Sequence, residues 1–113
     1  MPTKVDIHPR FRKQTRRLRR RFALIHRDLR PLFQRLRNDE RPGQLVPGVG
    51  YTVYKVRLPN LAARRGKSRG FRVIYYAQLS DRVFLITIYS KTEQNDISVA
   101  EIRDLVTEAE QES

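Results

Sequence analysis

The chain has 113 residues, which is enough for one domain with a single modest core and too few for two. Its 24 Lys and Arg against 12 Asp and Glu give a formal charge of +12, which indicates a polyanionic partner such as RNA, DNA, a ribosome or an acidic protein. The absence of cysteine excludes disulfides and thiolate zinc sites, and no apolar run approaches the roughly 18 residues of a membrane span. We therefore expect a cytoplasmic protein without a membrane partner.

The charge is divided unevenly along the chain. Residues 1–92 contain 23 bases and five acids, a net charge of +18, whereas residues 93–113 contain seven acids and one base, a net charge of −6. An acidic segment attached to a basic body can shield that body, although an ordinary solvated helix has the same composition. Both interpretations stay open from composition alone.

A short strand and two helices are predicted in the first third of the chain. Residues 4–8 alternate in polarity as a strand does, and the proline that follows can begin a helix. Apolar residues then recur at helical steps, which predicts a hairpin of helices at about 9–25 and 29–38. With Asp28 as the N-cap of the second helix, Pro31 falls in its tolerated first turn.

A loop and three strands are predicted next. Residues 38–50 contain two Pro-Gly pairs, which are strong turn signals. Three runs rich in β-branched and aromatic residues then predict strands at 51–58, 70–78 and 82–89. The near-continuous apolarity of the second and third runs indicates central strands that are covered on at least one face.

A last helix at about 99–110 completes the predicted order of elements. Ser98 can serve as its N-cap, and Glu101, three residues later, makes a capping box. Runs of helices beside runs of strands indicate an α+β fold. We expect one domain spanning residues 1–113, with a small antiparallel sheet and the helices gathered on one side of it.

Cationic side chains gather around two of the predicted strands. Lys55 and Arg57 are two apart on one strand, so they project from the same face. Arg72 begins the next strand, where its guanidinium can hold a phosphate through two hydrogen bonds. Tyr89 and Lys91 end the third strand. The loop between the first two strands adds four cations: Arg64, Arg65, Lys67 and Arg69.

Such a cluster suits phosphodiester chemistry. Cleaving RNA without a metal requires that the 2′-OH lose a proton, that the phosphorane be stabilised and that the 5′-oxygen be protonated. Cations supply the second requirement directly, and they lower the pKa of a neighbouring Lys or Tyr so that it can exchange a proton. A protein that only binds RNA would carry the same basic surface, and the chemistry alone leaves both open.

The first helix carries a second basic cluster, with five arginines among residues 16–21. They fall mainly on its outer face, where they are either a solvated flank or a contact to ribosomal RNA. The candidate RNA contacts are Arg16, Arg17 and Arg20.

The sequence does not indicate a metal site or a nucleotide-binding site. His8 and His26 have no Cys, Asp or Glu at metal-ligand spacing, so we expect structural or surface roles for both and no cofactor. Residues 66–68 read Gly-Lys-Ser, but they lack the upstream glycine and the following helix of a nucleotide-binding P-loop.

Residues 39–98 resemble the RelE/HigB group of bacterial type II toxins, within the RelE/ParE superfamily. The matching stretches are RPG at 41–43, VPGVG at 46–50, YKVR at 54–57, GKSRGFRVIYY at 66–76, LITIYSK at 85–91 and EQNDI at 93–97. They occur in the expected order and spacing, and the preceding helix pair and short first strand also suit the architecture of this group.

The resemblance implies a toxin with a fold similar to small microbial ribonucleases, which enters the ribosomal A site and cuts the messenger there. It also implies a cognate antitoxin, usually encoded beside the toxin, and a toxin–antitoxin hetero-oligomer. Lys55 and Arg57 match the paired basic residues of the group, and Arg72 matches the Arg that is expected to contact the scissile phosphate.

The chain departs from the RelE branch at two positions. Thr92 follows Lys91 where that branch has another Arg, and Ser98 stands where it has a late Tyr. The chain is more similar to the HigB-like branch, which has the glycine-flanked basic loop and a Tyr-x-Lys ending. The resemblance therefore assigns the acid–base role to Tyr89 and Lys91, with support from the cations of the loop.

Two alternatives to an mRNA interferase stay open. The ParE-like toxins share the fold but poison DNA gyrase, and they would not need a compact cationic cluster. A non-catalytic protein that binds RNA or the ribosome would use the Arg-rich first helix, and it would bind with a steep salt dependence without cleavage.

Overall fold

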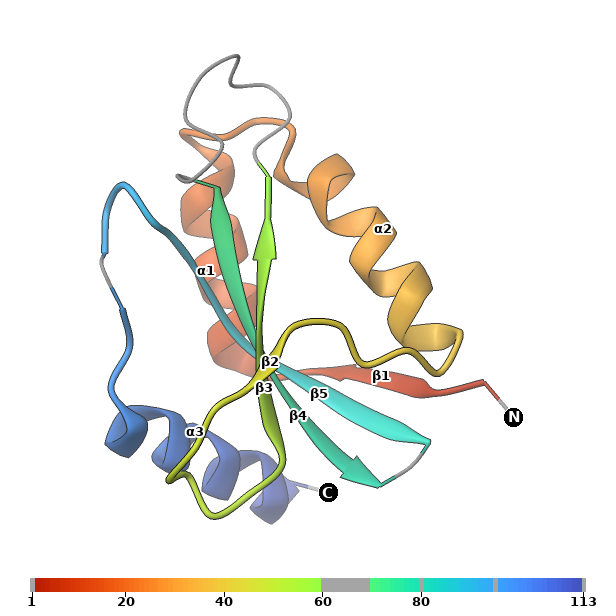
Figure 1. Ribbon diagram of the computed structural model, residues 1–113. Helices are drawn as coiled ribbons and strands as arrows, with labels where there is room; N and C mark the ends of the chain where they lie inside the picture. The colour runs from red at the N-terminus through yellow and green to blue at the C-terminus, as the bar shows by residue number, and fades with distance from the viewer. Residues whose placement is uncertain (1, 60–69, 80, 95, 113) are drawn as a thin grey trace.

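The computed structural model of the chain describes residues 2–59, 70–79, 81–94 and 96–112 (Figure 1). The elements in chain order are β1 (Lys4–Ile7), α1 (Pro9–Arg19), α2 (Ile25–Arg37), β2 (Gln44–Leu45), β3 (Val53–Leu58), β4 (Phe71–Leu79), β5 (Arg82–Ser90) and α3 (Val99–Glu112). This confirms the predicted α+β class. No helix within the described ranges has both the length and the apolar composition needed to cross a bilayer.

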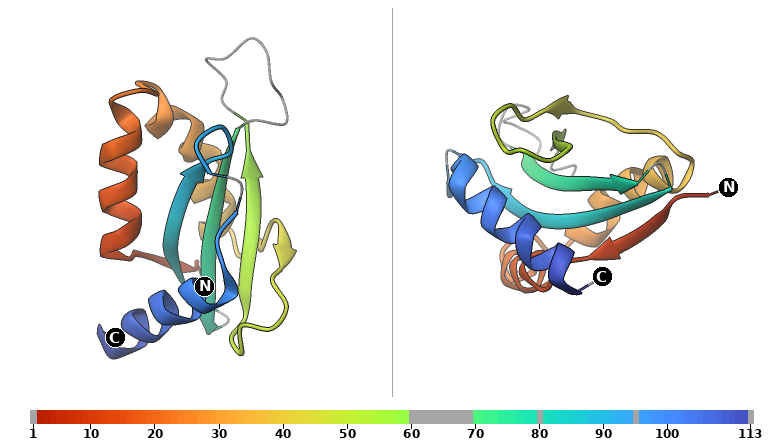
Figure 2. Two further views of the ribbon diagram at one scale, coloured as in Figure 1. Left: turned by 90° about the vertical axis from the view of Figure 1, so that its left-hand side faces the viewer. Right: turned by 90° about the horizontal axis from the view of Figure 1, so that it is seen from below.

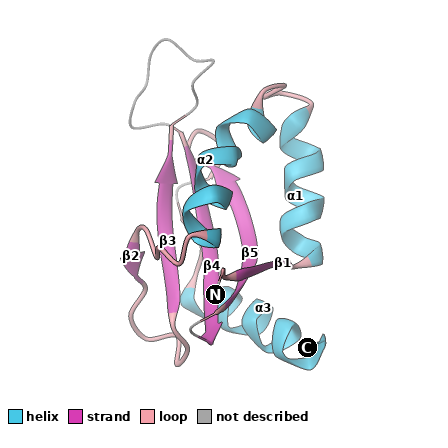
Figure 3. Ribbon diagram, turned by 90° about the vertical axis from the view of Figure 1, so that its right-hand side faces the viewer, coloured by secondary structure: helices cyan, strands magenta, loops and turns pink. Residues whose placement is uncertain are grey.

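The described strands form one sheet in the order β1-β5-β4-β3-β2, with β2 and β1 at its two edges (Figure 3). Strands β2 to β5 are antiparallel, and β3, β4 and β5 begin and end within two residues of their predicted bounds. The expectation of a purely antiparallel sheet is wrong at one edge, because β1 pairs with β5 in parallel, from Lys4 opposite Arg82 to Ile7 opposite Leu85. The long chain between β1 and β5 allows this orientation.

The helices cover both faces of the sheet, so the prediction that they gather on one side is wrong. On β4, Val73 and Tyr75 pack with α1 and α2, whereas Ile74 and Tyr76 pack with α3. Since successive residues of a strand point to opposite faces, the two sets lie on opposite sides of the sheet. Helix α1 runs alongside the strands, and α3 crosses one end of the sheet (Figure 2).

Each face carries its own apolar core. Deeply buried members on the α1–α2 side include Leu18, Ile25, Leu36, Val73, Tyr75 and Leu85. On the α3 side, the helix contributes Ile102, Leu105, Val106 and Ala109, and the sheet contributes Val53, Ile74, Tyr76, Phe84 and Ile86. Burying β4 and β5 on both faces explains why their sequences are apolar almost without interruption.

The boundary between α1 and α2 lies elsewhere than predicted. Helix α1 ends at Arg19 rather than near residue 25, since the chain turns so that Phe22 packs edge-to-face on Phe71, with ring centroids 5.1 Å apart. Helix α2 begins after Leu24, so Asp28 lies inside its first turn and Pro31 lies in its interior. An interior proline costs a helix about 3 kcal/mol, and the apolar face that α2 buries offsets this cost.

Side chains cap two of the helices. His8 is buried at the N-cap of α1, where its Nδ1 accepts a hydrogen bond from the backbone N–H of Arg10 at 2.9 Å. The predicted cap of α3 is confirmed, because Ser98 Oγ accepts from the backbone N–H of Glu101 at 3.1 Å.

Gly70 brings three strand ends together. It precedes β4, and a Cβ at this position would collide with the backbone carbonyl oxygen of Leu58 at the end of β3. Its own carbonyl oxygen accepts a hydrogen bond of 3.1 Å from the backbone N–H of Lys91, just beyond β5. Only glycine allows the backbones of β3 and β4 to approach this closely.

We expect Gly70→Ala to lower the free energy of unfolding by about 3 kcal/mol, because the added methyl must displace backbone. The matched control is Gly48→Ala, whose Cβ would meet open space. Since Gly48 has a φ of +82°, this variant should lose only about 1 kcal/mol through backbone strain. Urea unfolding measures both, and a Gly70 variant no less stable than the Gly48 variant would contradict the steric argument.

Candidate active site

One face of the sheet changes from apolar to basic along its length. Val53, Lys55 and Arg57 point to the same side of β3, and Val53 lies buried beneath α3. On β4 the same side carries Tyr76 and Ile74 under α3 and then Arg72. The end of the face that α3 leaves open is therefore lined by cations from neighbouring strands.

A β-bulge decides which side chains β5 presents to this open end. Ile74 pairs with Thr87 and Tyr75 pairs with Leu85, so one residue of β5 is extra. The irregularity shifts the alternation by one, and Tyr89 comes to lie directly opposite Arg72. Bulges commonly re-aim side chains next to active sites.

Arg57, Arg72 and Tyr89 form one row across three strands, since Arg57 pairs with Arg72 and Arg72 pairs with Tyr89. Like charges directly opposite each other destabilise a sheet. An anion bound across the two guanidinium groups would offset this repulsion through bidentate hydrogen bonds. The register thus creates a place that favours a phosphate.

Arg57 and Arg72 of this row line a cleft of about 580 Å³, whereas Tyr89 is buried beside it and is not among its lining residues. Its lining residues are Gly43, Gln44, Lys55, Arg57, Arg72 and Lys91. Four of these six residues are cationic and none is acidic. Such a concentration of positive charge in a concave site attracts polyanions.

The cations differ in how firmly they are held. Arg72 is only 6% exposed, and one of its guanidinium nitrogens donates to the carbonyl oxygen of Phe71 at 3.3 Å. Lys55 and Lys91 are half-buried, whereas Arg57 is exposed. Arg72 is therefore the most deeply enclosed cation of the cleft.

Gly43 closes one side of the cleft. Its φ of +96° favours glycine, and a Cβ here would collide with the carbonyl oxygen of Lys55. The following residue, Gln44, pairs with Lys55 as the first residue of β2. The sequence predicted only a loop here and pointed to neither residue, because a strand of two residues is too short to show a period.

Tyr89 is buried and keeps its proton at neutral pH. Its hydroxyl donates to Oδ1 of Asp96 at 3.1 Å. Burial, followed by the charge of Asp96 and this hydrogen bond, raises the pKa of Tyr89 to about 12, although the charge of Arg72 opposes the shift. At neutral pH the phenol can therefore donate a proton but cannot accept one.

Asp96 is an acidic residue beside the cleft that sequence analysis did not single out. Its Oδ1 also accepts from Lys55 Nζ at 3.3 Å. A hydrogen bond from the backbone N–H of Ile97 lowers the pKa of Asp96 most, and the contacts with Tyr89 and Lys55 lower it further, against a smaller effect of burial. The only available signal was its place in the stretch EQNDI at 93–97, which matched as a whole.

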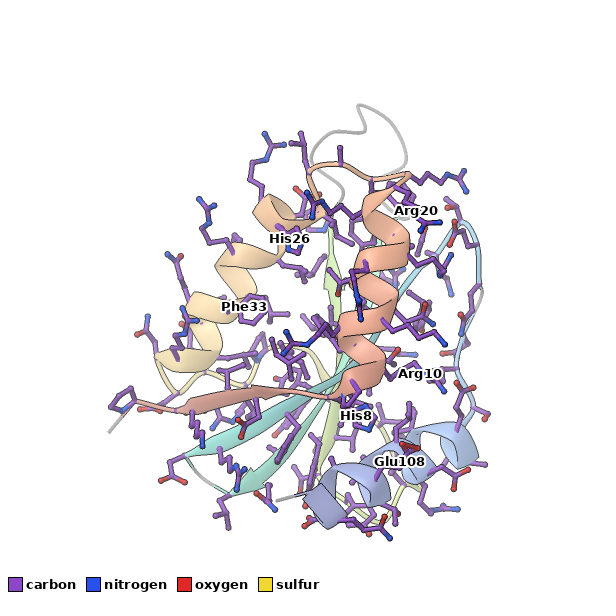
Figure 4. The ribbon with its side chains drawn as sticks, turned by 180° about the vertical axis from the view of Figure 1, so that it is seen from behind. His8, Arg10, Arg20, His26, Phe33 and Glu108 are labelled. Carbon is purple, nitrogen blue, oxygen red and sulfur yellow. The ribbon has the colours of Figure 1, made fainter. Side chains whose placement is uncertain are left out.

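The candidate RNA contacts on the first helix do not line the cleft. Arg16, Arg17 and Arg20 are exposed on α1, with Arg20 beyond its last turn (Figure 4). Arg17 and Arg21 both contact the carboxylate of Glu93, at 3.0 and 3.2 Å. The loop candidates Arg64, Arg65, Lys67 and Arg69 lie outside the described residues.

The described residues contain no group of three or more His, Asp or Glu side chains that could hold a metal ion. His26 is exposed on α2, and His8 is buried at the start of α1 with its Nε2 3.7 Å from Glu108 of α3 (Figure 4).

Comparison with known protein families identifies a match over most of the chain. The model of a family described as the RelE toxin of the RelE / RelB toxin-antitoxin system matches residues 12–112. The matched region includes every residue that lines the cleft. A search of curated proteins gave no significant match.

We expect inorganic phosphate to stabilise the folded protein by binding in the cleft. A concentration ten times the dissociation constant would add about 1.4 kcal/mol and raise the melting temperature by about 5 °C. Arg72→Ala should lose most of this rise, whereas Arg35→Ala, which alters an exposed arginine paired with Glu40 on α2, should keep it. Melting curves in phosphate and in chloride of equal ionic strength distinguish binding from screening, and equal rises in both variants would contradict a phosphate site at Arg72.

Proposed function

Because the chain belongs to the RelE toxin family, we propose that this toxin is an mRNA interferase that cleaves messenger RNA in the ribosomal A site without a metal ion. The observation that carries the proposal is the row formed by Arg57, Arg72 and Tyr89 at the open end of the sheet. It combines two cations for a phosphate with a protonated group in line with them.

The residues of the cleft fit the steps of RNA cleavage. The 2′-hydroxyl loses its proton to a base as its oxygen attacks the phosphorus, the bond to the 5′-oxygen breaks, and an acid protonates that oxygen, so that a 2′,3′-cyclic phosphate and a free 5′-hydroxyl form. Arg57 and Arg72 would hold the phosphate and neutralise the phosphorane, and Lys55 would add a third cation at the rim. This is the charge stabilisation that a metal ion would otherwise supply.

Tyr89 fits the role of general acid. It remains protonated at neutral pH, and a phenol in that state can protonate the departing 5′-oxygen. Lys91, which lines the cleft, is the second candidate for proton transfer. The resemblance to the HigB-like branch points to the same two residues and leaves open which of them takes which proton.

The outer face of α1 would bind ribosomal RNA. Lys13, Arg16 and Arg20 line shallow depressions there, away from the cleft. Contacts with the phosphate backbone carry no sequence information but fix orientation, so they would direct the toxin to the ribosome. The toxin would act in the cytoplasm, where translating ribosomes lie.

We expect Arg72→Ala to lower cleavage by about 10²–10³-fold, because one donor to the transition state is lost from a preorganised site. Primer extension on messengers after a short pulse of expression in a bacterium measures this. The wild type and Arg35→Ala should both give new cuts at codon-phased positions of translated regions, and a folded Arg72→Ala should not.

Two outcomes of that experiment would contradict the proposal. Full cleavage by folded Arg72→Ala would remove Arg72 from the site. Growth arrest with intact messengers would point instead to DNA gyrase, as for ParE-like toxins, or to a protein that blocks the ribosome without cleavage.

Membership of the RelE family implies an antitoxin partner. The net charge of +18 on residues 1–92 should attract an acidic segment of that partner in a hetero-oligomer and accelerate association. We expect the association rate constant to fall at least tenfold between about 50 and 500 mM salt, as measured by stopped-flow mixing. An association rate that does not change with ionic strength would show that charge plays no part in recognition.

A further inference from the structure

A single carboxylate oxygen joins two residues of the candidate site. Oδ1 of Asp96 lies 3.3 Å from Lys55 Nζ and 3.1 Å from the hydroxyl of Tyr89, and it accepts the backbone N–H of Ile97 at 2.8 Å. Lys55 comes from β3 and Tyr89 from β5, on the two sides of β4. Asp96 thus bridges the cleft from a segment that belongs to neither strand.

The segment that carries Asp96 is anchored at several points. The backbone N–H of Lys91 binds the carbonyl oxygen of Gly70, and the Glu93 carboxylate binds two arginines of the α1 end. The side-chain amide of Gln94 donates to the carbonyl oxygen of Asp96 at 2.8 Å. These contacts fix where the carboxylate lies.

Stability alone does not explain this arrangement. The side chain of Asp96 is 63% exposed and that of Lys55 is 38% exposed, so solvent screens their ion pair. A carboxylate beside an anion-binding cleft also opposes the binding of a phosphate. The position of Asp96 therefore lowers the affinity for a phosphate substrate. We expect it to raise the rate of the reaction in compensation.

Preorganisation supplies that benefit. A lysine has a long flexible stem, and holding its ammonium in one place removes an entropic cost from the reaction. The hydrogen bond from the Tyr89 hydroxyl to Asp96 holds the phenol oxygen in one place, and this bond must break before Tyr89 can protonate a leaving oxygen.

We propose that Asp96 is a positioning residue of this site, which fixes the Lys55 ammonium and the Tyr89 hydroxyl at the edge of the phosphate-binding cleft. The inference rests on the proposed function, since positioning has a meaning only if the cleft processes RNA. Asp96 should therefore raise the rate at which the bound complex cleaves RNA, and not the affinity of the toxin for RNA.

Single-turnover cleavage of messenger on programmed ribosomes tests this role with three variants. Asp96→Ala removes the acceptor, whereas Asp96→Asn keeps an acceptor oxygen but loses the charge. Asp104→Asn makes the same change of net charge at an exposed position of α3 and serves as the matched control. Circular dichroism verifies that each variant is folded.

We expect Asp96→Ala to lower the rate at saturating toxin by about tenfold to a hundredfold. The concentration for half-saturation should stay the same or fall, because a charge that repels phosphate is gone. Asp96→Asn should recover most of the rate, and Asp104→Asn should match the wild type. An unchanged or higher saturated rate in folded Asp96→Ala, or no recovery by Asp96→Asn, would overturn the proposal.

A second readout does not depend on cleavage. The ¹³Cζ resonance of Tyr89, assigned with Tyr89→Phe, follows ionisation of the phenol as pH rises. Since Asp96 helps to raise the pKa of Tyr89 to about 12, both Asp96 variants should titrate at lower pH. An unshifted titration would overturn the placement of Asp96. A wild type that cleaves no messenger would defeat the proposed function instead, and the titration would still decide whether Asp96 acts on Tyr89.

Discussion

Two arginines face each other across neighbouring strands of one sheet, and much of the molecule serves to keep them there. Arg57 and Arg72 are register partners, and their repulsion opposes the pairing of β3 with β4. The two apolar cores that flank these strands supply the free energy that overcomes it. An anion that binds between the two guanidinium groups offsets repulsion of this kind.

The cations of the cleft were accessible from sequence because they follow simple rules. Lys55 and Arg57 share a face through the period of two, and Arg72 opens a strand with an unmistakable β-pattern. The position of Tyr89 was less secure, because simple alternation from Phe84 and Ile86 would have placed Ile88 on the cleft face. The bulge in β5 reverses this outcome, and a bulge leaves no signature in a continuously apolar run.

Long-range packing decided what sequence analysis predicted wrongly. The helical period of the apolar residues continues through the turn between α1 and α2, so no local signal predicts that α1 ends at Arg19. The contact of Phe22 with Phe71 explains why it ends there. Continuous apolarity in β4 and β5 indicated cover on at least one face, but not that α3 would occupy the second. Asp96 reaches Lys55 across 41 positions of sequence, which no local rule could have joined.

The acidic C-terminal segment, residues 93–113, neutralises particular basic side chains of the body. Its carboxylates meet individual bases of the body, as Glu93 meets Arg17 and Glu101 meets Arg10 at 3.1 Å. Surface pairs of this kind add little stability, so their main effect is to reduce the positive potential around individual bases.

The parallel pairing of β1 with β5 also has a consequence for synthesis of the chain. Lys4 is synthesised long before its partner Arg82, so β1 must wait for β5 before the two can pair. Until then β4 lacks the neighbour that carries Tyr89, and the row of the cleft is unfinished. Closing so long a loop is slow, and the open sheet edge can meanwhile pair with other chains. In a chain of this topology, the row of Arg57, Arg72 and Tyr89 is therefore complete only once β5 has joined the sheet.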